Sequence, residues 1–388
     1  MLNFMKIAYI TPYDATNILN WSGTAYYIAH AFKHQTISLN YINSFQQKSL
    51  LRRKVKGYLY KHLVKKKHMG EKEPLSLRFY ADQIHRTLSS LNSDIVFSLG
   101  TDPIAYLQCD QPIVFWTDTS FAGAIDYIPS CRNLCRETII NGNKAEQSAL
   151  ERCRLAIYSS EWAARIAINH YKIDPSKVKV VPFGANIEIE CERTLDDIKS
   201  IVQSRPSNQC NLLFLGGEWI NKRGDIAIEV ARELNRSGLP TVLTLVGCGP
   251  IGREPLPDFV RSYGFISKST EEGLSKIKKL LAESHFLILP SWAECTPIQF
   301  CEANAFGVPC LATKVGGVTS VIKDGLNGWT FSRDAHIKEY CSYIFDLFLN
   351  YEKYKELAYS SFNEYQNRLN WANAVGEVKR LLENIRYR

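Results

Sequence analysis

The stretch that decides the fold reads Phe286-Leu-Ile-Leu-Pro290, then Glu294-Cys-Thr-Pro-Ile-Gln-Phe-Cys-Glu302, then Cys310–Thr313. Its first part is short and apolar and ends at a proline, which predicts a buried strand. Pro297 suits the first turn of a helix, because its missing N–H is unbonded there anyway. The apolar run at 310–313 adds a second strand. A strand, a helix and a strand in this order are typical of a parallel sheet.

The same alternation extends over most of the chain on both sides of this stretch. Further strands are predicted at Met5–Thr11, Asp94–Leu99, Pro112–Trp116, Ala156–Ser159, Lys177–Val181, Leu212–Gly216, Val242–Val246 and Tyr263–Ile266. Helices are predicted from Gly23, over Asp225–Leu234 and Glu271–Glu283, and from Ala335 onward. Residues 184–209 are polar and show no strand, so they interrupt the pattern. We expect two α/β domains of the doubly wound, Rossmann-like kind, with parallel sheets and a ligand cleft between them.

Composition agrees with a globular chain of two domains. The chain has 388 residues, of which 45% are hydrophobic and 22% charged, enough for more than one core. Its eleven cysteines are an odd number without C-x-x-C spacing, which favours reduced thiols in a cytoplasm. No secretory signal or membrane-spanning run is predicted. No D-x-D sequence or cluster of histidines and carboxylates predicts a bound metal.

The net charge of +8 is concentrated in one segment. Between Leu51 and Glu73 nine basic residues stand against two acids, so this segment alone carries +7. Apolar residues at regular spacing among the cations predict a basic amphipathic helix. Its polar side is either a solvated surface or a contact for an anionic membrane or acceptor. Nucleic acid is not expected, because no recognition motif accompanies the charge.

The two glutamates of the deciding stretch suggest a binding chemistry. The free N–H groups of a helix start form an anion site, so a phosphate can rest at Thr296–Ile298. Glu294 lies just before that turn and can reach an adjoining sugar. Glu302 lies inside the helix and can bind a diol such as ribose. The alternative is a pair of solvated glutamates on a helix, but the strand, proline turn and small residues around them favour a site.

This block resembles the E-x7-E donor motif of the family 4 glycosyltransferases, which have the GT-B fold. The resemblance runs in order through nearly the whole chain apart from residues 51–73. It includes segments similar to the family's glycine loop, linker lead-in, donor-phosphate loop and following turns: Trp21-Ser-Gly-Thr24, Val180-Val-Pro-Phe-Gly-Ala-Asn186, Phe214–Gly224, Val315-Gly-Gly-Val318 and Asp324-Gly-Leu-Asn-Gly328.

By that resemblance the chain has an N-terminal acceptor domain over residues 1–184, a linker over 185–210 and a donor domain over 211–367. The C-terminal helix, about 368–388, is expected to return to the first domain.

The resemblance also implies roles for single residues. Glu294 contacts the transferred sugar, Glu302 holds the ribose, and Lys222 or Arg223 neutralises the diphosphate leaving group. The family usually has an arginine earlier in this loop, where the chain reads Gly216-Gly-Glu218. Expelling a nucleoside diphosphate needs positive charge and preorganised donors, in agreement with these roles.

The remaining donor ligands are predicted at Gly23, Phe265, Thr296, Pro297 and Ile298. Gly23 lets the backbone approach the phosphate or sugar, because it has no side chain. Phe265 either packs against the donor base or belongs to the core.

Asp118 follows a predicted strand at a place where many family members have a histidine. It either binds a hydroxyl of the sugar or acceptor, or caps the next helix. With Glu294 and Lys222 it completes the predicted catalytic set.

The sequence therefore predicts a retaining, metal-independent hexosyltransferase of glycan biosynthesis that needs no cofactor beyond its nucleotide-sugar substrate. Alternatives are a GT-B nucleotide-sugar epimerase and a sugar-nucleotide-binding protein without catalysis. The expected partners are the donor and a sugar, lipid or protein acceptor. The expected location is the cytoplasm, with peripheral contact at the inner face of the membrane through residues 51–73. The base, sugar, acceptor, linkage and oligomeric state are not encoded in any motif we identify.

Overall fold

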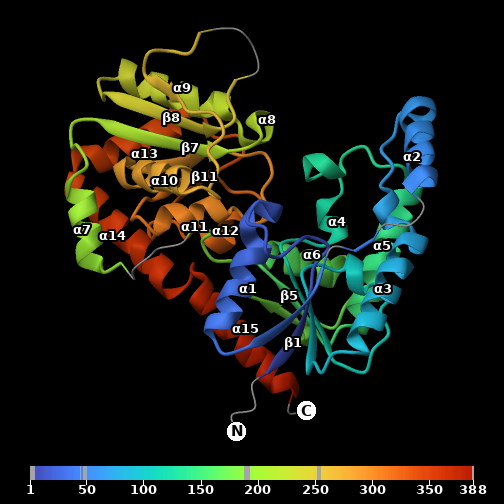
Figure 1. Ribbon diagram of the computed structural model, residues 1–388. Coiled ribbons are helices and arrows are strands. Elements are labelled where there is room, and N and C mark those ends of the chain that lie inside the picture. Colours follow the sequence, from blue (N-terminus) through green and yellow to red (C-terminus); the bar gives the residue numbers. More distant parts are fainter. Residues whose placement is uncertain (1–4, 44, 47–49, 188–192, 251–254, 387–388) are drawn as a thin grey trace. The chain divides into compact units, whose positions relative to one another are not determined.

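The computed structural model describes residues 5–43, 45–46, 50–187, 193–250 and 255–386 (Figure 1). Contacts divide the chain into two units. Unit 1 comprises Met1–Pro182 and Ala374–Arg388, and unit 2 comprises Phe183–Asn373. Each unit contains one six-stranded sheet in which every pair of neighbouring strands is parallel. The predicted α/β class with two doubly wound sheets is therefore confirmed.

The sheet of unit 1 has the strand order β2-β1-β3-β4-β5-β6. Its strands are β1 Lys6–Ile10, β2 Ser38–Ile42, β3 Ile95–Ser98, β4 Ile113–Thr117, β5 Leu155–Tyr158 and β6 Val178–Val180. Every residue of β3, β4 and β5 is buried, so helices must cover both faces of this sheet. The order reverses between β1 and β3, because the chain adds β2 on one side of β1 and β3 on the other.

The helices of unit 1 surround this sheet. They are α1 Thr24–His34, α2 Leu50–Leu59, α3 Pro74–Leu88, α4 Phe121–Ala124, α5 Arg136–Arg152, α6 Glu161–Tyr171 and the greater part of α15 Trp371–Arg386. A π-helical turn, η2 Tyr60–Val64, continues α2, and five short 3-10 turns are η1 Asn20–Gly23, η3 Gly70–Lys72, η4 Asp102–Ile104, η5 Pro129–Cys131 and η6 Pro175–Lys177. In α15, Val375, Val378 and Leu382 are fully buried. Lys379 also donates to the carbonyl of Gln35 after α1, at 3.1 Å.

The sheet of unit 2 has the order β12-β11-β10-β7-β8-β9. Its strands are β7 Cys210–Gly216, β8 Thr241–Gly247, β9 Val260–Ser262, β10 Phe286–Leu289, β11 Cys310–Thr313 and β12 Gly328–Phe331. Its helices are α7 Leu195–Gln203, α8 Trp219–Lys222, α9 Gly224–Arg236, α10 Glu271–Glu283, α11 Ile298–Asn304, α12 Val318–Val321, α13 Ile337–Leu349 and α14 Tyr351–Asn367. The order reverses between β7 and β10, so this pair forms the switch point of the sheet.

The structure departs from the predicted elements in four places. Two short strands, β2 and β12, were not predicted. The strand expected at Tyr263–Ile266 is wrong, because β9 ends at Ser262 and Phe265 lies in the loop beyond it. The polar stretch predicted as a linker contains α7, which Thr194 begins with a capping box to Asp197. Part of that stretch, residues 188–192, lies outside the described residues.

Two general features of the described residues bear on the later argument. None of their helices combines the length and the apolar character that crossing a membrane requires. The ten cysteines among them are all free thiols.

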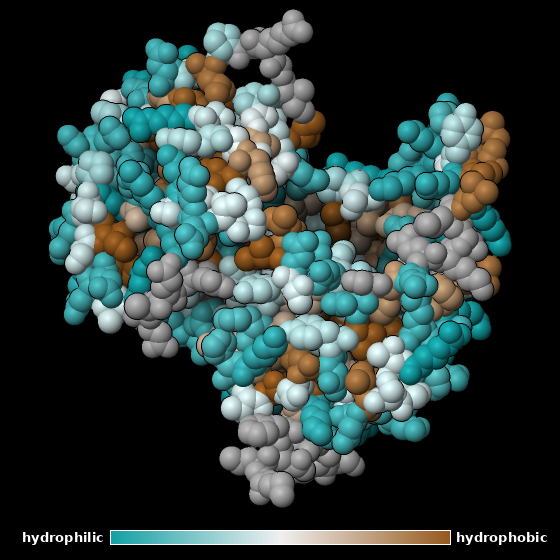
Figure 2. Space-filling model, viewed as in Figure 1, coloured by the Kyte–Doolittle hydropathy of each residue, from teal (hydrophilic) through white to brown (hydrophobic). Residues whose placement is uncertain are grey.

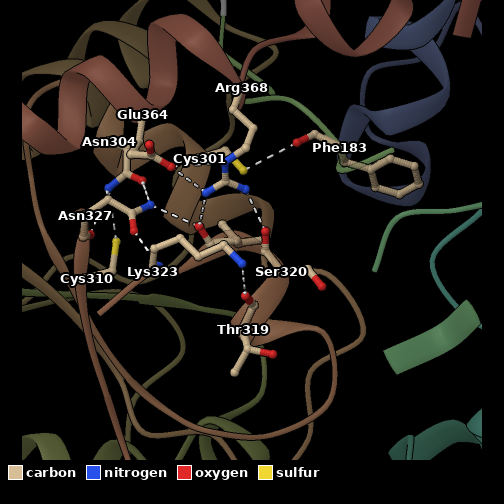
Figure 3. Close-up of polar contacts among 11 residues, drawn as sticks. Phe183, Cys301, Asn304, Cys310, Thr319, Ser320, Lys323, Asn327, Glu364 and Arg368 are labelled. Carbon is tan, nitrogen blue, oxygen red and sulfur yellow. Dashed lines mark hydrogen bonds and ion pairs between the residues drawn. The ribbon is translucent and has the colours of Figure 1, made fainter. Parts of the chain in front are cut away.

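A buried amide pair fixes the helix that follows β10 (Figure 3). Asn327 donates from Nδ2 to Asn304 Oδ1 at 2.7 Å and to the carbonyl of Val321 at 3.0 Å, while its Oδ1 accepts from the Lys323 N–H at 2.7 Å. Both asparagines are fully buried. Arg368 closes the same region by donating to the carbonyl of Ser320 at 2.6 Å. The turn 323–328 and helix α11 are thus tied together by hydrogen bonds that water cannot replace.

We expect Asn327→Ala to lower the free energy of unfolding by about 2–3 kcal/mol, because it leaves buried donors and acceptors without partners. Urea unfolding followed by circular dichroism measures this change. Asn169→Ala, at an exposed position of α6, is the control and should change stability by less than about 0.5 kcal/mol. Equal stability of the two variants would show that the amide pair is not structurally important.

Candidate functional site

The switch point of unit 2 brings together a lysine and a glutamate from distant parts of the chain. Lys222 ends α8, which follows β7, and Glu294 lies in the loop after β10. Lys222 Nζ lies 2.5 Å from Glu294 Oε1, and Ser291 Oγ donates to the same oxygen at 2.6 Å. Both side chains of the ion pair are largely buried, with 12% and 7% exposure. The two residues predicted to act on the donor therefore form one charged unit at the carboxyl ends of adjacent strands.

Hydrogen bonds to backbone groups hold three loops around this ion pair. Asn221 accepts from the Trp292 N–H at 2.7 Å and donates from its side chain to the Ala293 carbonyl at 3.1 Å. The carbonyl of Glu294 accepts from the Gly317 N–H at 3.0 Å. The predicted donor-phosphate loop and the glycine turn at 315–318 are thus fastened to the E-x7-E segment.

Glu302 lies on α11 and is fully buried. Its Oε1 forms an ion pair with Lys268 Nζ, which also donates to the carbonyl of Asn186 at 3.3 Å. Its Oε2 has no hydrogen-bond partner among the described residues. Burial raises the pKa of this carboxyl, and Lys268 opposes that rise. A buried carboxylate oxygen without a partner costs free energy. A ligand hydroxyl that donates a hydrogen bond to Oε2 would recover that cost.

The predicted anion site at Thr296–Ile298 differs from expectation in one detail. Helix α11 begins at Ile298, so Pro297 precedes the first turn instead of standing in it. The N–H of Ile298 donates to the carbonyl of Thr296 at 3.0 Å and is already bonded.

Two arginines stack on one tryptophan beside the Lys222–Glu294 ion pair. The guanidinium of Arg223 lies 4.3 Å from the ring centre of Trp292, and that of Arg333 lies 4.9 Å from it. Arg223 also donates to the carbonyl of Arg333 at 3.3 Å. Arg333 was not predicted, because it follows β12 and is more than a hundred residues away from Arg223 in sequence. It adds a second guanidinium over the ring of Trp292.

Phe265 is exposed over 76% of its surface, so the alternative that it is a core aromatic is wrong. Its ring is available for stacking beyond the end of β9.

In unit 1 the predicted glycine loop has an unusual backbone. Trp21, Ser22 and Gly23 all have positive φ angles, of 48°, 54° and 88°. Gly23 is the N-cap of α1, and a Cβ at this position would lie 3.2 Å from the Ile18 carbonyl oxygen. Only glycine adopts this conformation without strain, so the loop depends on it.

A pocket of about 320 Å³ opens in unit 1 next to that loop. It lies at the carboxyl ends of β1, β3 and β4, where the strand order reverses, and its lining includes Tyr13, Trp21, Lys72, Thr101, Asp102, Asp118 and Glu146. A parallel sheet places its ligand sites at this edge. Unit 1 therefore has a polar pocket of its own at the position where sequence reasoning placed Asp118.

Asp118 does not cap the next helix. Ser120 caps α4 by accepting from the Gly123 N–H, so the capping alternative is wrong. Burial raises the pKa of Asp118 to about 6, although Trp21 and Thr117 donate hydrogen bonds to the carboxylate. The aspartate is thus linked to the glycine loop through the side chain of Trp21.

Three further charged residues of this pocket were missed by sequence reasoning. Lys72 Nζ lies 2.7 Å from Asp102 Oδ1 and 4.8 Å from the ring centre of Phe121. Glu146 is buried on α5, where Thr101 Oγ1 donates to its Oε2 at 2.5 Å and its Oε1 has no partner among the described residues. Nothing in the sequence distinguishes Glu146 from a solvated helical glutamate, and Lys72 appears only as one cation of the basic segment.

Comparisons with known proteins show similarity to glycosyltransferases. Residues 209–350 match the family model described as glycosyl transferases group 1. The D-inositol 3-phosphate glycosyltransferase of Nocardiopsis dassonvillei is 24% identical over 61% of this chain and 57% of its own length. The UDP-Gal:alpha-D-GlcNAc-diphosphoundecaprenol alpha-1,3-galactosyltransferase of Escherichia coli is 25% identical over 42% of this chain and 43% of its own length. The chain thus spans about half the length of the curated relatives it matches.

Solved structures resemble the chain over nearly its whole length. A glycosyltransferase from Rickettsia africae has a TM-score of 0.66 at 16% identity and covers 99% of both chains. The Anabaena protein HepE in complex with UDP-glucose has a TM-score of 0.60 at 16% identity, with 98% of this chain and 100% of that chain covered. At this identity the likeness establishes the fold.

The buried Glu146 provides a test of the unit 1 pocket through pH. Burial raises the pKa of its carboxyl from 4.5 to about 7, so the folded protein keeps a proton that the unfolded chain releases. The stability that this group contributes is fully present below about pH 4.5 and is lost as the pH rises through about 7. We expect Glu146→Gln, which cannot ionise, to match the parent protein near pH 4.5. At pH 8 it should be more stable by up to about 3 kcal/mol.

Urea unfolding at both pH values measures the difference. Glu151→Gln, at an exposed position of the same helix, should behave like the parent protein throughout. A stability difference between Glu146→Gln and the parent protein that does not change with pH would contradict the raised pKa of Glu146.

Proposed function

We propose that this chain, which has the GT-B fold and resembles the family 4 glycosyltransferases, transfers a sugar from a nucleoside-diphosphate sugar to an acceptor hydroxyl. The observation that carries the proposal is the Lys222–Glu294 ion pair at the switch point of the unit 2 sheet. A donor diphosphate carries more negative charge than one carboxylate and competes for the same ammonium. Once Lys222 turns to the phosphate, Glu294 is free to accept hydrogen bonds from hydroxyls of the transferred sugar.

Positive charge around the phosphates would stabilise the leaving group. Lys222, Arg223 and Arg333 gather on this side of unit 2, and Trp292 holds the two guanidiniums by stacking. Arginine suits phosphate because its planar fork donates two parallel hydrogen bonds. Arg333 thus takes the role of the arginine that the family usually has earlier in the loop.

Glu302 would hold the ribose of the donor. Its unpartnered Oε2 can accept from one ribose hydroxyl, while Lys268 holds Oε1 on the other side. Phe265, exposed beyond β9, offers a face for the base. We propose a uridine nucleotide. The similar structure of HepE carries UDP-glucose, and the name of the Escherichia coli relative begins with UDP-Gal.

The acceptor would enter through the polar pocket of unit 1. Asp118 and Glu146 supply hydrogen-bond acceptors for hydroxyl groups, and the loop at Gly23 allows close backbone approach. We propose that transfer retains the anomeric configuration and needs no metal ion. In that reaction the bond from the anomeric carbon to the phosphate breaks as the bond to the acceptor oxygen forms on the same face. The departing phosphate takes the acceptor proton.

A thermal-shift screen of UDP-, GDP-, ADP- and dTDP-sugars tests donor binding. The UDP-sugars should raise the melting temperature most, because a ligand that binds only the folded state stabilises it by mass action. Glu302→Gln should reduce the shift. Donor incubated alone should give no epimer, which separates transfer from epimerisation. The absence of a shift with every nucleotide sugar would contradict the proposal.

We expect Glu294→Ala to lose turnover by roughly 10²-fold or more, because one transition-state contact and the partner of Lys222 are removed together. Release of nucleoside diphosphate from the best donor of the screen measures turnover. The melting temperature should stay near that of the parent protein. Glu272→Ala, at an exposed position of α10, is the control with full activity. Near-normal turnover of Glu294→Ala would refute its role.

A further inference from the structure

The basic segment predicted at residues 51–73 forms a helix with two distinct sides. At about 3.6 residues per turn, α2 places Arg53 and Lys56 on one side and Leu51 and Val55 on the other. The helix then continues through η2 to Val64. One side is fastened to unit 1, and the other faces solvent.

The fastened side uses ion pairs and hydrogen bonds. Lys56 Nζ lies 2.8 Å from Glu73 Oε1 and 2.5 Å from Glu137 Oε1, and the Tyr60 hydroxyl donates to Glu137 at 2.8 Å. His68 lies close enough to Glu73 and Glu137 for the three to hold a metal ion, but Lys56 already supplies a cation to both carboxylates. This cluster therefore anchors the helix, so its outer side has a defined orientation.

The outer side exposes large apolar side chains. Leu51, Val55, Tyr58, Leu59 and Leu63 are exposed over 77%, 52%, 63%, 46% and 75% of their surfaces. Figure 2 shows hydrophobic side chains beside hydrophilic ones at the place where Figure 1 labels α2. A continuous exposed stripe of this kind marks an interaction surface, whereas scattered single residues do not.

Cations flank this apolar stripe without opposing charge. Arg52, Lys54, Lys61, Lys65 and Lys66 are exposed, and none of them pairs with an acid among the described residues. No aspartate or glutamate occurs between Leu50 and Gly70. Other surface lysines of the chain, such as Lys199 and Lys355, pair with an acid three residues away. The positive charge of this side is therefore available to an external anion.

We infer that α2 and η2 lie in the surface of an anionic lipid bilayer, with the apolar stripe among the acyl chains and the flanking cations at the headgroups. An apolar stripe between rows of lysine and arginine is the arrangement of an interfacial helix. A second copy of this chain fits less well, because two segments of charge +7 would repel each other. Nucleic acid would use the cations but not the apolar stripe.

The same segment ends at the pocket of unit 1. Met69, Glu71 and Lys72 lie just beyond η2 and belong to the pocket lining. If the proposed function holds, the bilayer would therefore present the pocket with an acceptor whose hydroxyl group is attached to a lipid.

Co-sedimentation with phosphatidylcholine vesicles, with and without phosphatidylglycerol, tests the inference on the full chain. The protein should bind the anionic vesicles at low salt and release at about 1 M salt, where the Debye length is about 3 Å. Lys54→Glu/Lys61→Glu should weaken binding by roughly tenfold or more, since each basic residue near the surface contributes substantially. Leu63→Ser should weaken it at least about threefold.

Matched controls lie on unit 2. Lys338→Glu/Lys353→Glu changes the charge equally at exposed positions, and Leu349→Ser removes a leucine that is 83% exposed. Both should bind vesicles like the parent protein, and circular dichroism should show every variant folded.

Three results would overturn the inference: no binding to anionic vesicles at low salt, binding that the α2 and η2 variants leave unchanged, or loss of binding on charge reversal with no effect of Leu63→Ser. The assay contains no nucleotide sugar or acceptor, so its failure would leave the transferase proposal standing.

Discussion

The parallel pairing of β7 with β10 is the constraint on which the donor side depends. Both strands run in the same direction, so the loops that follow them emerge at one edge of the sheet. The chain leaves β7 toward β8 and leaves β10 toward β11, which separates the two crossover helices at this edge. Lys222 and Glu294 meet there although they are 72 residues apart. The sheet of unit 1 repeats the arrangement at β1 and β3, where its own pocket lies.

Three lysine–carboxylate pairs recur at the candidate sites, and each is partly withdrawn from water. They are Lys222–Glu294, Lys268–Glu302 and Lys72–Asp102. Removing charges from water costs free energy that the attraction between them only partly offsets, so such pairs are seldom kept for stability alone. In a site they keep each charge in place until a ligand of higher charge or better geometry replaces one partner.

Sequence reasoning succeeded where a pattern is local. The strand at 286–290, the helix at 271–283 and the strand at 310–313 depend on apolar runs and breakers that can be read directly. It failed where structure depends on remote neighbours. Strand β12 contains Gly328 at a φ of 151°, where a Cβ would overlap the carbonyl of Cys310, and its four residues show no alternation.

The site residues also divide into those that a local pattern reveals and those that depend on remote partners. Glu294 and Glu302 stand within one motif and could be selected from it. Lys268, Arg333 and Glu146 acquire their importance from partners 34 to 110 residues away, which no spacing rule reveals. Burial is equally hidden, since Glu146 and an exposed neighbour such as Glu151 look alike in the sequence.

The division of unit 1 into two pieces has a consequence for how the chain folds as it is made. A ribosome completes all of unit 2 before it releases Ala374–Arg388, the last piece of unit 1. Until then the surface that buries Val375, Val378 and Leu382 remains uncovered. Unit 2 can reach its final state first, whereas unit 1 must wait, partly assembled, until residues 374–388 have been made. Unit 1 begins earlier in the chain and yet is the later of the two units to complete its core.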